Sequence, residues 1–526
     1  MVHTRPSTPA GHGELLARPA FEEWASLLAE NRAAAAGWSF TVAGRPVADV
    51  RAQARAEALA AGAEFSARLG VDVRAPGEPD AAVVLTGHQP ELYHPGVWIK
   101  DFLLERLARE TGASSIDIVV DTDGFDTLAV SSPCMTPGVA RCHQYLAVSD
   151  KDACFATSPV PTQRDLEDFC RAGDEQLASL PSSAVRRHFA AFCDEMRVAA
   201  NVAENLAEFV TIARRRYEAS AGTGYMELPL TLASRTGAWH AFVADLALNA
   251  ARFADAYNAE LAEYRTVNKI RSSAQPFPDL SVSADVVELP LWRIADGRRS
   301  GVSARRLEAG GALLLGADGE TLVELPKDGV AAAEVLEASG ELLAPKALAL
   351  TLFARVFVCD LMIHGVGGGR YDRVTDGVCR RYYGVEPPAF VVASITMYLP
   401  LGAHVVTEEE VAGAKERLNR LEHNPDALLG EVEFDSADEQ HRAAALAAEK
   451  TALVEAIASP GADKKALGLQ IREANAQLAA LLAPLKQGMA DELAVLQTQL
   501  VESEILTDRT YPFCFWAAQE VADKAW

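Results

Sequence analysis

The spacing of apolar residues changes twice between positions 81 and 126. Residues 81–87 (AAVVLTG) form a short apolar run that ends in glycine, which is typical of a buried strand. Residues 96–112 place apolar side chains three and four positions apart and end in glycine, which predicts a helix. Residues 115–126 (SIDIVVDTDGFD) predict a second apolar strand that ends in acidic residues. Strand, helix and strand in this order form a βαβ unit, so we expect a parallel sheet.

The pattern of the whole chain predicts an α/β protein with a Rossmann-like parallel-sheet core. Residues 14–70 are Ala-rich with helical spacing, residues 160–275 are mainly helical, and residues 278–330 carry strand and hairpin signals. We expect four parts: an N-terminal helical segment (1–75), a Rossmann-like core with inserted helical and β-hairpin connecting segments (80–405), a long-helix coiled coil (406–510) and a closing C-terminal segment (511–526).

From Thr407 onward the apolar spacing is that of long helices. Thr407 precedes three glutamates, as an N-cap does before an acidic first turn. The sequence SPGA at 459–462 interrupts the pattern, and apolar residues then recur at helical spacing at Ile471, Ala474, Leu478 and Leu481. This predicts a C-terminal α-helical coiled-coil hairpin, through which we expect the chain to form a homodimer. Pro484 is expected to kink the second arm.

The charge of the chain limits its partners. Lys and Arg number 49 against 73 Asp and Glu, so the net charge is −24. Nucleic-acid binders need a basic surface to neutralise phosphates, so we expect no nucleic acid as a partner. No stretch approaches 18 uninterrupted apolar residues and the N-terminal sequence lacks an apolar core, so we expect no membrane partner and no secretory signal. These features predict a cytoplasmic protein that acts on small molecules.

The eight cysteines show no CxxC spacing. We expect reduced thiols, because a chain of this length needs no disulfide to fold. Cys134, Cys142 and Cys154 cluster in sequence next to His143, which leaves a metal site as the alternative.

The loop after the first predicted strand is the first candidate site (TGHQPELYHPGVW, 86–98). His88 and His94 are candidates for acid–base chemistry or for donating to an anion, because imidazole titrates near neutral pH. The alternative is a rigid loop shaped by aromatic and proline residues. The candidate binding residues of this loop are Gly87, Gln89, Tyr93 and Trp98.

The second candidate follows the second strand, where Asp121, Asp123 and Asp126 stand close together in sequence. Carboxylates here suit Mg²⁺, an amine or a ribose, and we place Asp121 and Asp123 among the catalytic residues. Helix capping and turn formation are the alternative. Because the carboxyl ends of parallel strands share one edge of a sheet, both loops are expected to face one crevice.

The third candidate is a glycine cluster in CDLMIHGVGGGRYDRVTD (359–376). Backbone amides and an arginine fork in such a loop grip phosphate or carboxylate, although the sequence is neither a Walker A loop nor a GxGxxG fingerprint. A tight chain crossing is the alternative. The candidate binding residues are His364, Gly367, Gly368, Arg370, Tyr371 and Asp372. The stretch SRTGAWHAF (234–242), with Ser234 and Arg235, is interpreted as a helix start.

These motifs, in this order, resemble the bacillithiol-biosynthesis cysteine-adding enzymes, a family of cysteine ligases. The family's loop of the form VVTGQQ corresponds to VVLTGHQPELYHPGVWIK, and its acidic strand end corresponds to IVVDTDGFD. A β-hairpin, a Pro-led helix and an apolar run ending in Gly-Gly correspond to ALLLGADGETLVEL and APKALALTLFARVFVCDLMIHGVGG. The agreement in order covers about residues 80–510. His88 stands where the family has Gln, and the family's His after the second strand is absent here.

The resemblance implies a Rossmann-like core, a dimerising coiled coil, and condensation of cysteine or a similar amine with a sugar-linked acceptor. It also implies nucleotide binding, so ATP or ADP, with Mg²⁺, are the expected cofactors, and no metal site of its own is assigned to the chain. Transferred by position, the active-site residues are Gly87, His88 and Gln89, the acidic strand end is Asp121 and Asp123, and the glycine pair is Gly367 and Gly368.

Three functions therefore stay open at this point. The first is a cytoplasmic ligase-like enzyme that joins cysteine or another amine to a sugar-linked acceptor. The second is a nucleotidyl or phosphoryl transferase of Rossmann-like fold, with Asp121 and Asp123 on Mg²⁺ and His88 on the phosphates. The third is a non-enzymatic scaffold that acts through its coiled coil.

Overall fold

The computed structural model describes residues 7–78, 80–135, 138–402, 405–434 and 436–526. The fold is mixed α/β, with a central sheet that is partly parallel and partly antiparallel. The chain divides into two compact units. The larger unit comprises Met1–Cys134, Cys142–Leu399 and Arg509–Trp526, and the smaller unit comprises Met135–Arg141 and Pro400–Asp508.

The central sheet of the larger unit has six strands, in the order β1-β15-β14-β4-β5-β8. Their bounds are β1 Leu15–Arg18, β15 Val391–Ile395, β14 Leu361–His364, β4 Val83–His88, β5 Ser114–Val119 and β8 Met226–Pro229. The last five run parallel, and β1 is antiparallel to β15. From β4 the chain moves outward to β5 and β8 on one side, then to β14 and β15 on the other. The strand order therefore reverses at β4.

The first βαβ unit is confirmed by β4, the helix α3 (Pro95–Thr111) and β5. His94 caps α3 at its N-terminus, and Gly112 ends it with φ 69°, a left-handed conformation that glycine adopts without strain. α3 is buried along most of its length, and β4 and β5 are almost fully buried, as the continuous apolar runs predict.

A long insertion separates β5 from β8. It begins with a β-hairpin and continues as helices: β6 (Thr127–Cys134), β7 (Ala140–Val148), α4 (Gln163–Leu177), α5 (Ser183–Ala200) and α6 (Leu206–Glu218). After β8 come α7 (Leu230–Ala233), α8 (Gly237–Leu248) and α9 (Ala250–Asn268). The helical pattern of 160–275 is thus confirmed, apart from the short strand β8, whose four residues are too few for a clear period.

A second sheet is wholly antiparallel, in the order β12-β11-β10-β9-β13. Its strands are β9 Val286–Ala295, β10 Arg298–Arg306, β11 Ala312–Leu315, β12 Thr321–Leu325 and β13 Leu343–Pro345. The predicted hairpin turn joins β11 to β12, where the amide of Gly316 donates to the carbonyl of Glu320. α10 (Gly329–Ser339) connects β12 to β13. α11 (Ala347–Phe353) and a π-helical turn, η4 (Ala354–Val358), then lead to β14 and α12 (Val366–Tyr383).

The N-terminal segment is not purely helical. It contains α1 (Trp24–Ala36) and α2 (Val47–Ser66), as the spacing predicts, but β1 precedes them and completes the central sheet. A small hairpin, β2 (Thr41–Val42) with β3 (Arg45–Pro46), lies between the two helices. β1 is only four residues long, which is too short for a clear alternation of apolar residues. Its pairing partner lies some 380 positions away, so the local sequence does not predict this strand.

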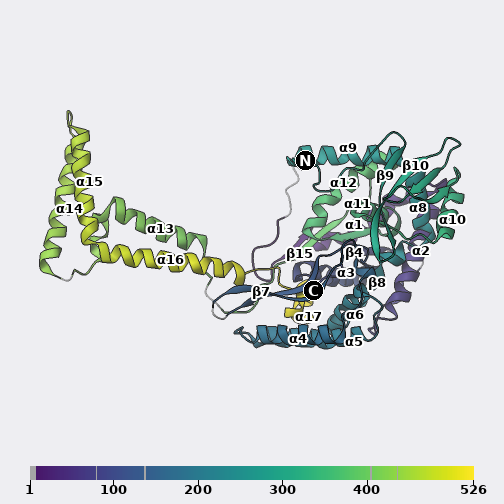
Figure 1. Cartoon of the computed structure of the whole chain (residues 1–526), viewed down its shortest axis with the longest axis horizontal. Coiled ribbons are helices and arrows are strands. Elements are labelled where there is room, and N and C mark those ends of the chain that lie inside the picture. Colours follow the sequence, from purple (N-terminus) through teal and green to yellow (C-terminus); the bar gives the residue numbers. More distant parts are fainter. Residues whose placement is uncertain (1–6, 79, 136–137, 403–404, 435) are drawn as a thin grey trace. The chain divides into compact units, whose positions relative to one another are not determined.

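The smaller unit is helical, with α13 (Glu408–His423), α14 (Ala437–Ile457), α15 (Lys464–Leu481) and α16 (Ala483–Leu506). Within it, α14 packs beside α15 and α13 beside α16 (Figure 1). Thr407 caps α13, and the chain breaks between α14 and α15 at the SPGA sequence, as predicted. The expected kink at Pro484 is wrong: α15 ends before it and Pro484 lies in the first turn of α16, where its missing N–H costs nothing.

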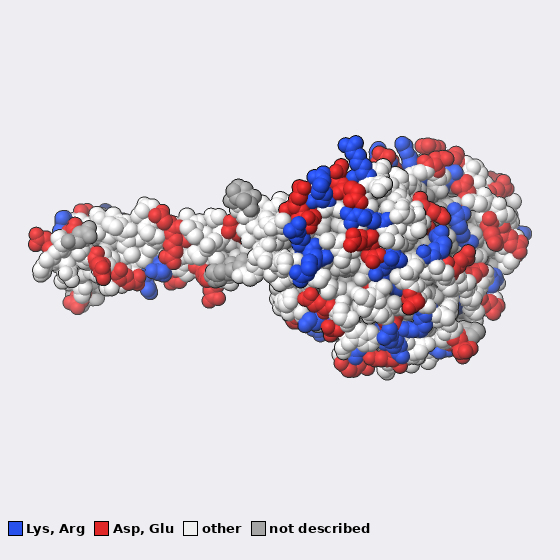
Figure 2. Space-filling model, turned by 90° about the horizontal axis from the view of Figure 1, so that it is seen from below, with Lys and Arg blue, Asp and Glu red and all other residues white. Residues whose placement is uncertain are grey.

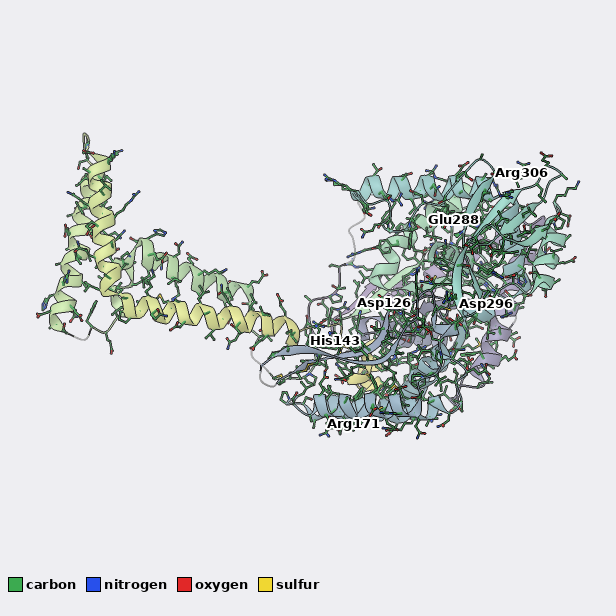
Figure 3. The ribbon with its side chains drawn as sticks, viewed as in Figure 1. Asp126, His143, Arg171, Glu288, Asp296 and Arg306 are labelled. Atoms are coloured by element: carbon green, nitrogen blue, oxygen red, sulfur yellow. A yellow bond between two sulfur atoms is a disulfide. The ribbon has the colours of Figure 1, made fainter. Side chains whose placement is uncertain are left out.

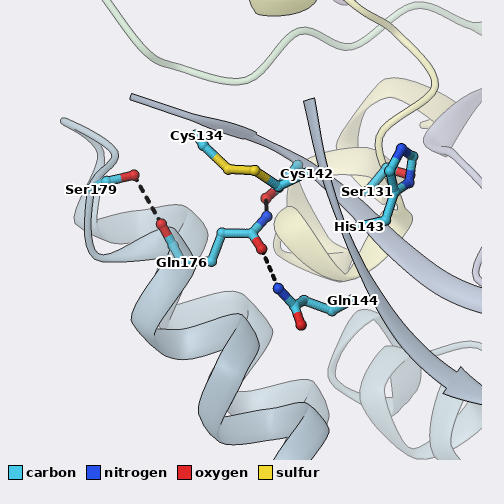
Figure 4. Close-up of a disulfide and its surroundings, with 8 residues drawn as sticks. Ser131, Cys134, Cys142, His143, Gln144, Gln176 and Ser179 are labelled. Carbon is cyan, nitrogen blue, oxygen red and sulfur yellow. Dashed lines mark hydrogen bonds between the residues drawn. A yellow bond between two sulfur atoms is a disulfide. The ribbon is translucent and has the colours of Figure 1, made fainter. Parts of the chain in front are cut away.

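The expectation that all cysteines are reduced is also wrong. Cys134 and Cys142 form a disulfide between β6 and β7, with their Cα atoms 6.1 Å apart (Figure 4). The hairpin brings together two residues whose spacing in sequence gave no sign of pairing. The other six cysteines are free and buried. Beside the bond, Ser131 and the Nδ1 atom of His143 are 2.8 Å apart, and no group of three or more His, Cys, Asp or Glu residues suited to a metal occurs in the described chain.

The surface of the larger unit carries charges of both signs. Acidic and basic side chains are interspersed over the visible face of the larger unit in Figure 2. None of the helices in the described ranges is long and apolar enough to cross a membrane. The C-terminal residues return to the larger unit, where Phe513 and α17 (Ala518–Ala525) are buried against α3.

Candidate functional site

The candidate site lies at the carboxyl end of β4, where the strand order reverses. In a parallel sheet this is where the ends of neighbouring strands leave a crevice for ligands. Gly87 and His88 end β4 and pair with Ile118 and Val119 of β5. On the other side, the hydroxyl of Thr86 donates to the carbonyl of Ile363 of β14 at 2.9 Å. A Cβ atom on Gly87 would lie 3.0 Å from the Ile118 carbonyl oxygen, so the close strand approach favours glycine there.

His88 is held in its neutral form. Burial lowers its pKa to about 3, and the nearby ammonium of Lys100 adds to the effect. Its Nδ1 atom lies 3.1 Å from the carbonyl oxygen of Gln89, so Nδ1 carries the proton and Nε2 is left with a lone pair. The edge of the ring packs against Tyr93 at a centroid distance of 5.1 Å. Such a low pKa makes His88 an acceptor of hydrogen bonds better suited to holding an N–H group than to removing a proton at pH 7.

The loops after β4 and β5 do face one another. The side-chain amide of Gln89 donates to Asp123 at 2.8 Å, and Arg299 of β10 donates to the other carboxylate oxygen at 2.7 Å. Burial, and then the charge of Asp123, raise the pKa of Glu91 in the same loop. Asp126, labelled in Figure 3, is exposed and takes no part in this cluster.

His94, Tyr93 and Trp98 have other surroundings. The Nδ1 atom of His94 accepts from the amide of Gly96 at 3.0 Å, so this side chain caps α3. Tyr93 donates to Asp101 at 3.2 Å, and the indole N–H of Trp98 donates to Glu218 at 2.7 Å. The structure therefore places Tyr93 and Trp98 in the interior beneath the loop.

That interior holds a cluster of buried charges that the sequence analysis missed. Arg214 donates to Asp101 at 2.9 Å, to Asp117 at 3.0 Å and to Glu227 at 2.7 Å. Burial and the neighbouring Asp117 raise the pKa of Asp101 to about 8, so the cluster retains protons at neutral pH. The available signal was the placement of Asp117 and Glu227 inside otherwise apolar strands.

Lys100 connects this cluster to the site. Its ammonium donates to the hydroxyl of Thr86 at 3.1 Å and to the carbonyl of Gly87 at 3.0 Å. Lys100 is 2% exposed, and burial lowers its pKa although Asp101 opposes the effect. A buried cation therefore lies directly behind the strand end that carries His88.

Asp121 and Asp123 do not converge on one point. Asp121 accepts from the amide and the hydroxyl of Thr231, at the start of α7, and burial raises its pKa to about 6. Asp123 is engaged by Gln89 and Arg299. With separate partners, the two carboxylates do not provide the shared oxygen set that Mg²⁺ requires.

The glycine cluster lies where β14 leads into α12. Gly365 is the N-cap of α12, and nothing lies within 4 Å of a Cβ built on Gly367, so the first turn of this helix is open. A Cβ atom on Gly368 would lie 3.0 Å from the Nδ1 atom of His364. Free amides at a helix start attract anions, and this one adjoins β4 through β14.

The remaining residues of this motif have partners or exposure of their own. His364 bonds to Asp372 through Nε2 at 2.8 Å, and Arg355 donates to the same carboxylate oxygen at 2.7 Å. Burial alone would raise the pKa of Asp372, but Arg355 and His364 outweigh it and hold that pKa well below its ordinary value. Tyr371 packs against Phe277, and Arg370 is exposed on α12.

The chain matches none of the protein-family models and none of the curated proteins with which we compared it.

Proposed function

We propose that the chain is a ligase-like enzyme whose active site lies at the carboxyl end of β4 in a Rossmann-like sheet. It would condense an amino acid or similar amine, with cysteine as the family resemblance implies, with a small acceptor that carries an anionic group, such as a sugar-linked carboxylate. The observation that carries the proposal is the neutral His88 at the point where the strand order reverses, between the Gln89–Asp123 pair and the open glycine-rich start of α12.

Each group has a distinct part in this proposal. The Nε2 lone pair of His88 accepts an N–H of the attacking amine and so orients the nitrogen lone pair toward the acceptor carbon. The amides of the first turn of α12 bind the anionic group of the acceptor. Formation of the C–N bond breaks the bond from the acceptor carbon to its leaving group, which departs with that bonding pair as a phosphate or nucleotide once the acceptor is activated, and the proton lost by the amine passes to water. A nucleotide, ATP or ADP, would activate the acceptor and is a ligand to be tested.

The alternatives have less support. Nucleotidyl or phosphoryl transfer through Mg²⁺ needs carboxylates that share an ion, whereas Asp121 and Asp123 have separate partners. A non-enzymatic scaffold would leave unexplained why a buried lysine and a neutral histidine meet at a strand end.

We further propose that the chain works in the cytoplasm as a homodimer, joined through the α14–α15 hairpin. Val454 and Leu469 are 47% and 58% exposed on these two helices, which is the kind of surface that a second helical pair covers. Six of the eight cysteines are free, which favours a reducing compartment despite the one disulfide.

The test is a ligand screen on the purified full chain. Melting temperatures are measured with ATP, ADP, CTP, Mg²⁺, cysteine, other amino acids and sugar-linked carboxylates. A ligand at one hundred times its dissociation constant adds about 2.7 kcal/mol to the unfolding free energy. Stabilisation by an amine and an acceptor that His88→Ala removes supports the proposal. His441→Ala, on an exposed face of α14, is the matched control. Stabilisation by a nucleotide with Mg²⁺ alone would favour phosphoryl transfer.

A further inference from the structure

A cavity of about 600 Å³ lies at the carboxyl ends of β5 and β8, one strand away from His88. His88 pairs with Val119, and Val119 pairs with Pro229; both of these partners line the cavity. The amide of Val120, next to Asp121, donates to the carbonyl of His88 at 3.0 Å. The cavity therefore adjoins the proposed active site through directly bonded backbone.

Two polar side chains on the inner wall are almost fully buried. Asp121 is 3% exposed and Thr211 is 1% exposed. Each carboxylate oxygen of Asp121 accepts one hydrogen bond from Thr231, and the backbone amides of Asp121 and Leu230 also favour its charged form. Thr211 lines the cavity from α6. Burial raises the pKa of Asp121, so a cationic ligand group would relieve an unfavourable buried charge.

The mouth of the cavity has one arginine available for a ligand. Arg235 is exposed and has no ion-pair partner among the residues that the structure describes. It lies in the turn between α7 and α8, two positions after the end of α7, the helix whose Thr231 holds Asp121. Arg68, the other arginine of the lining, is already paired with Glu204 and Glu208 at 3.1 and 2.8 Å.

The rest of the wall is mixed. Phe65 of α2, Leu232 of α7, Ile294 of β9 and Leu342 before β13 supply apolar surface, and Glu64, Glu204, Asn205 and Glu208 supply polar surface. A buried carboxylate, a guanidinium without an ion-pair partner in the described chain and several apolar side chains line the same cavity, and these match the three parts of an α-amino acid. We propose that this cavity binds an apolar α-amino acid, with its ammonium at Asp121 and Thr211, its carboxylate at Arg235 and its side chain on the apolar wall. The proposal rests on the proposed function and specifies its amine substrate: the amino acid binds here as its ammonium, and its nitrogen must lose one proton and leave Asp121 before it meets Nε2 of His88.

The test is isothermal titration calorimetry of the full chain with L-leucine. Three probes each remove one part of the ligand: 4-methylpentanoate lacks the ammonium, 3-methylbutylamine lacks the carboxylate, and glycine lacks the side chain. L-leucine is expected to bind, and each probe to bind at least about tenfold more weakly. The first two probes lose a charge-assisted hydrogen bond, and glycine loses the burial of an apolar side chain.

Two variants carry the decision, because Arg235 has no ion-pair partner in the described chain and Thr211→Val replaces only a hydroxyl by a methyl group. Arg235→Gln and Thr211→Val are each expected to weaken L-leucine binding, Arg235→Gln by about tenfold. Arg306→Gln, on the exposed end of β10 (Figure 3), is the matched control and should bind like the unaltered chain. Asp121→Asn should abolish binding, but it also alters the bonds to Thr231.

The outcomes separate this inference from the proposed function. No binding of L-leucine, or binding that is unchanged in both Arg235→Gln and Thr211→Val, would overturn the cavity assignment. If at the same time His88→Ala still removes the stabilisation by an amine and an acceptor, the proposed function stands with its amine elsewhere. Binding of L-leucine that requires Arg235, in a chain whose ligand responses ignore His88, supports the cavity and refutes the role of His88.

Discussion

The protonation state of His88 is set by its burial and by a charged group to which it is not bonded. The ring is kept neutral by burial and by the ammonium of Lys100, which is itself fixed by Thr86 and the Gly87 carbonyl. We expect Lys100→Met to raise the pKa of His88, because it removes the nearby positive charge. An NMR titration of the imidazole measures this directly. An unchanged pKa would mean that burial alone keeps the ring neutral.

The same residue makes a prediction about stability. Above pH 6.5 His88 is neutral in both folded and unfolded chains and contributes no pH dependence. Below pH 6.5 the unfolded chain binds a proton that the folded chain refuses until about pH 3. The free energy of unfolding should therefore decrease as the pH is lowered below 6.5. The contribution of His88 to this slope approaches about 1.4 kcal/mol per pH unit. His88→Gln should show a flatter decline between pH 6.5 and 5 in urea unfolding, and a decline as steep as that of the unaltered chain would contradict the prediction.

Asp372 makes stability depend on pH in the same direction as His88 but in a lower pH range, because its pKa is also lowered in the folded chain. Arg355 and His364 hold its pKa below the ordinary value, so its stabilising effect is present above about pH 3.9 and is lost as the pH falls further. At pH 7 we expect Asp372→Asn to cost about 3–5 kcal/mol of unfolding free energy, since it leaves Arg355 with one buried partner fewer. Asp168→Asn, which breaks an exposed ion pair on α4, should leave the melting temperature unchanged in the same assay.

The residues that sequence analysis identified correctly as neighbours are those fixed by one rule of sheet geometry. Gln89 and Asp123 follow adjacent parallel strands, and their side chains meet at 2.8 Å. The contact of Asp121 with Thr231, 110 positions away, depends on where β8 inserts, and no local pattern encodes that. The role of Lys100 could not be predicted for a similar reason. Its ammonium contacts the end of β4 only once α3 has packed against that strand.

Elements with a strong period were predictable, and elements defined by remote pairing were not. β4, α3, β5 and the β11–β12 hairpin follow from local spacing and turn residues. β1 and the Cys134–Cys142 bond depend on partners that only the folded chain supplies. The sequence predicted a kink at Pro484, whereas the structure has the end of one helix and the start of the next there. Proline disrupts a helix interior but is well suited to the first turn of a helix.

Two glycines of α12 separate packing from flexibility within one element. A Cβ atom on Gly369 would run into the Val392 side chain of β15, while a Cβ atom on Gly367 meets nothing within 4 Å. We expect Gly369→Ala to cost about 1–3 kcal/mol through overpacking. Gly367→Ala should be neutral or gain about 0.4–1 kcal/mol by restricting the unfolded chain. Chemical denaturation of both variants gives the comparison, and equal effects would show that α12 does not pack against β15 as described.

At the scale of the whole molecule, the larger unit is built from chain on both sides of the smaller one. Arg509 donates to Thr396 and Ser394 at 2.9 Å each, so the chain leaves and re-enters the larger unit at adjacent points. Phe513 then packs against Tyr93 and Trp98, and its amide donates to the Tyr93 carbonyl at 2.7 Å. The C-terminal residues are therefore part of the support beneath the candidate site.

This arrangement predicts opposite results from two deletions. Replacing residues 402–506 by a short Gly-Ser linker should leave a larger unit that unfolds cooperatively, because its two ends already meet at Thr396 and Arg509. Removing residues 509–526 instead should abolish cooperative unfolding, because it exposes Trp98 and its aromatic neighbours. Calorimetry distinguishes the two. Light scattering of the linker variant tests the proposed homodimer as well. A monomer from a dimeric parent places the dimer contact in the deleted helices α13–α16, which include the α14–α15 hairpin, and a retained dimer excludes that hairpin.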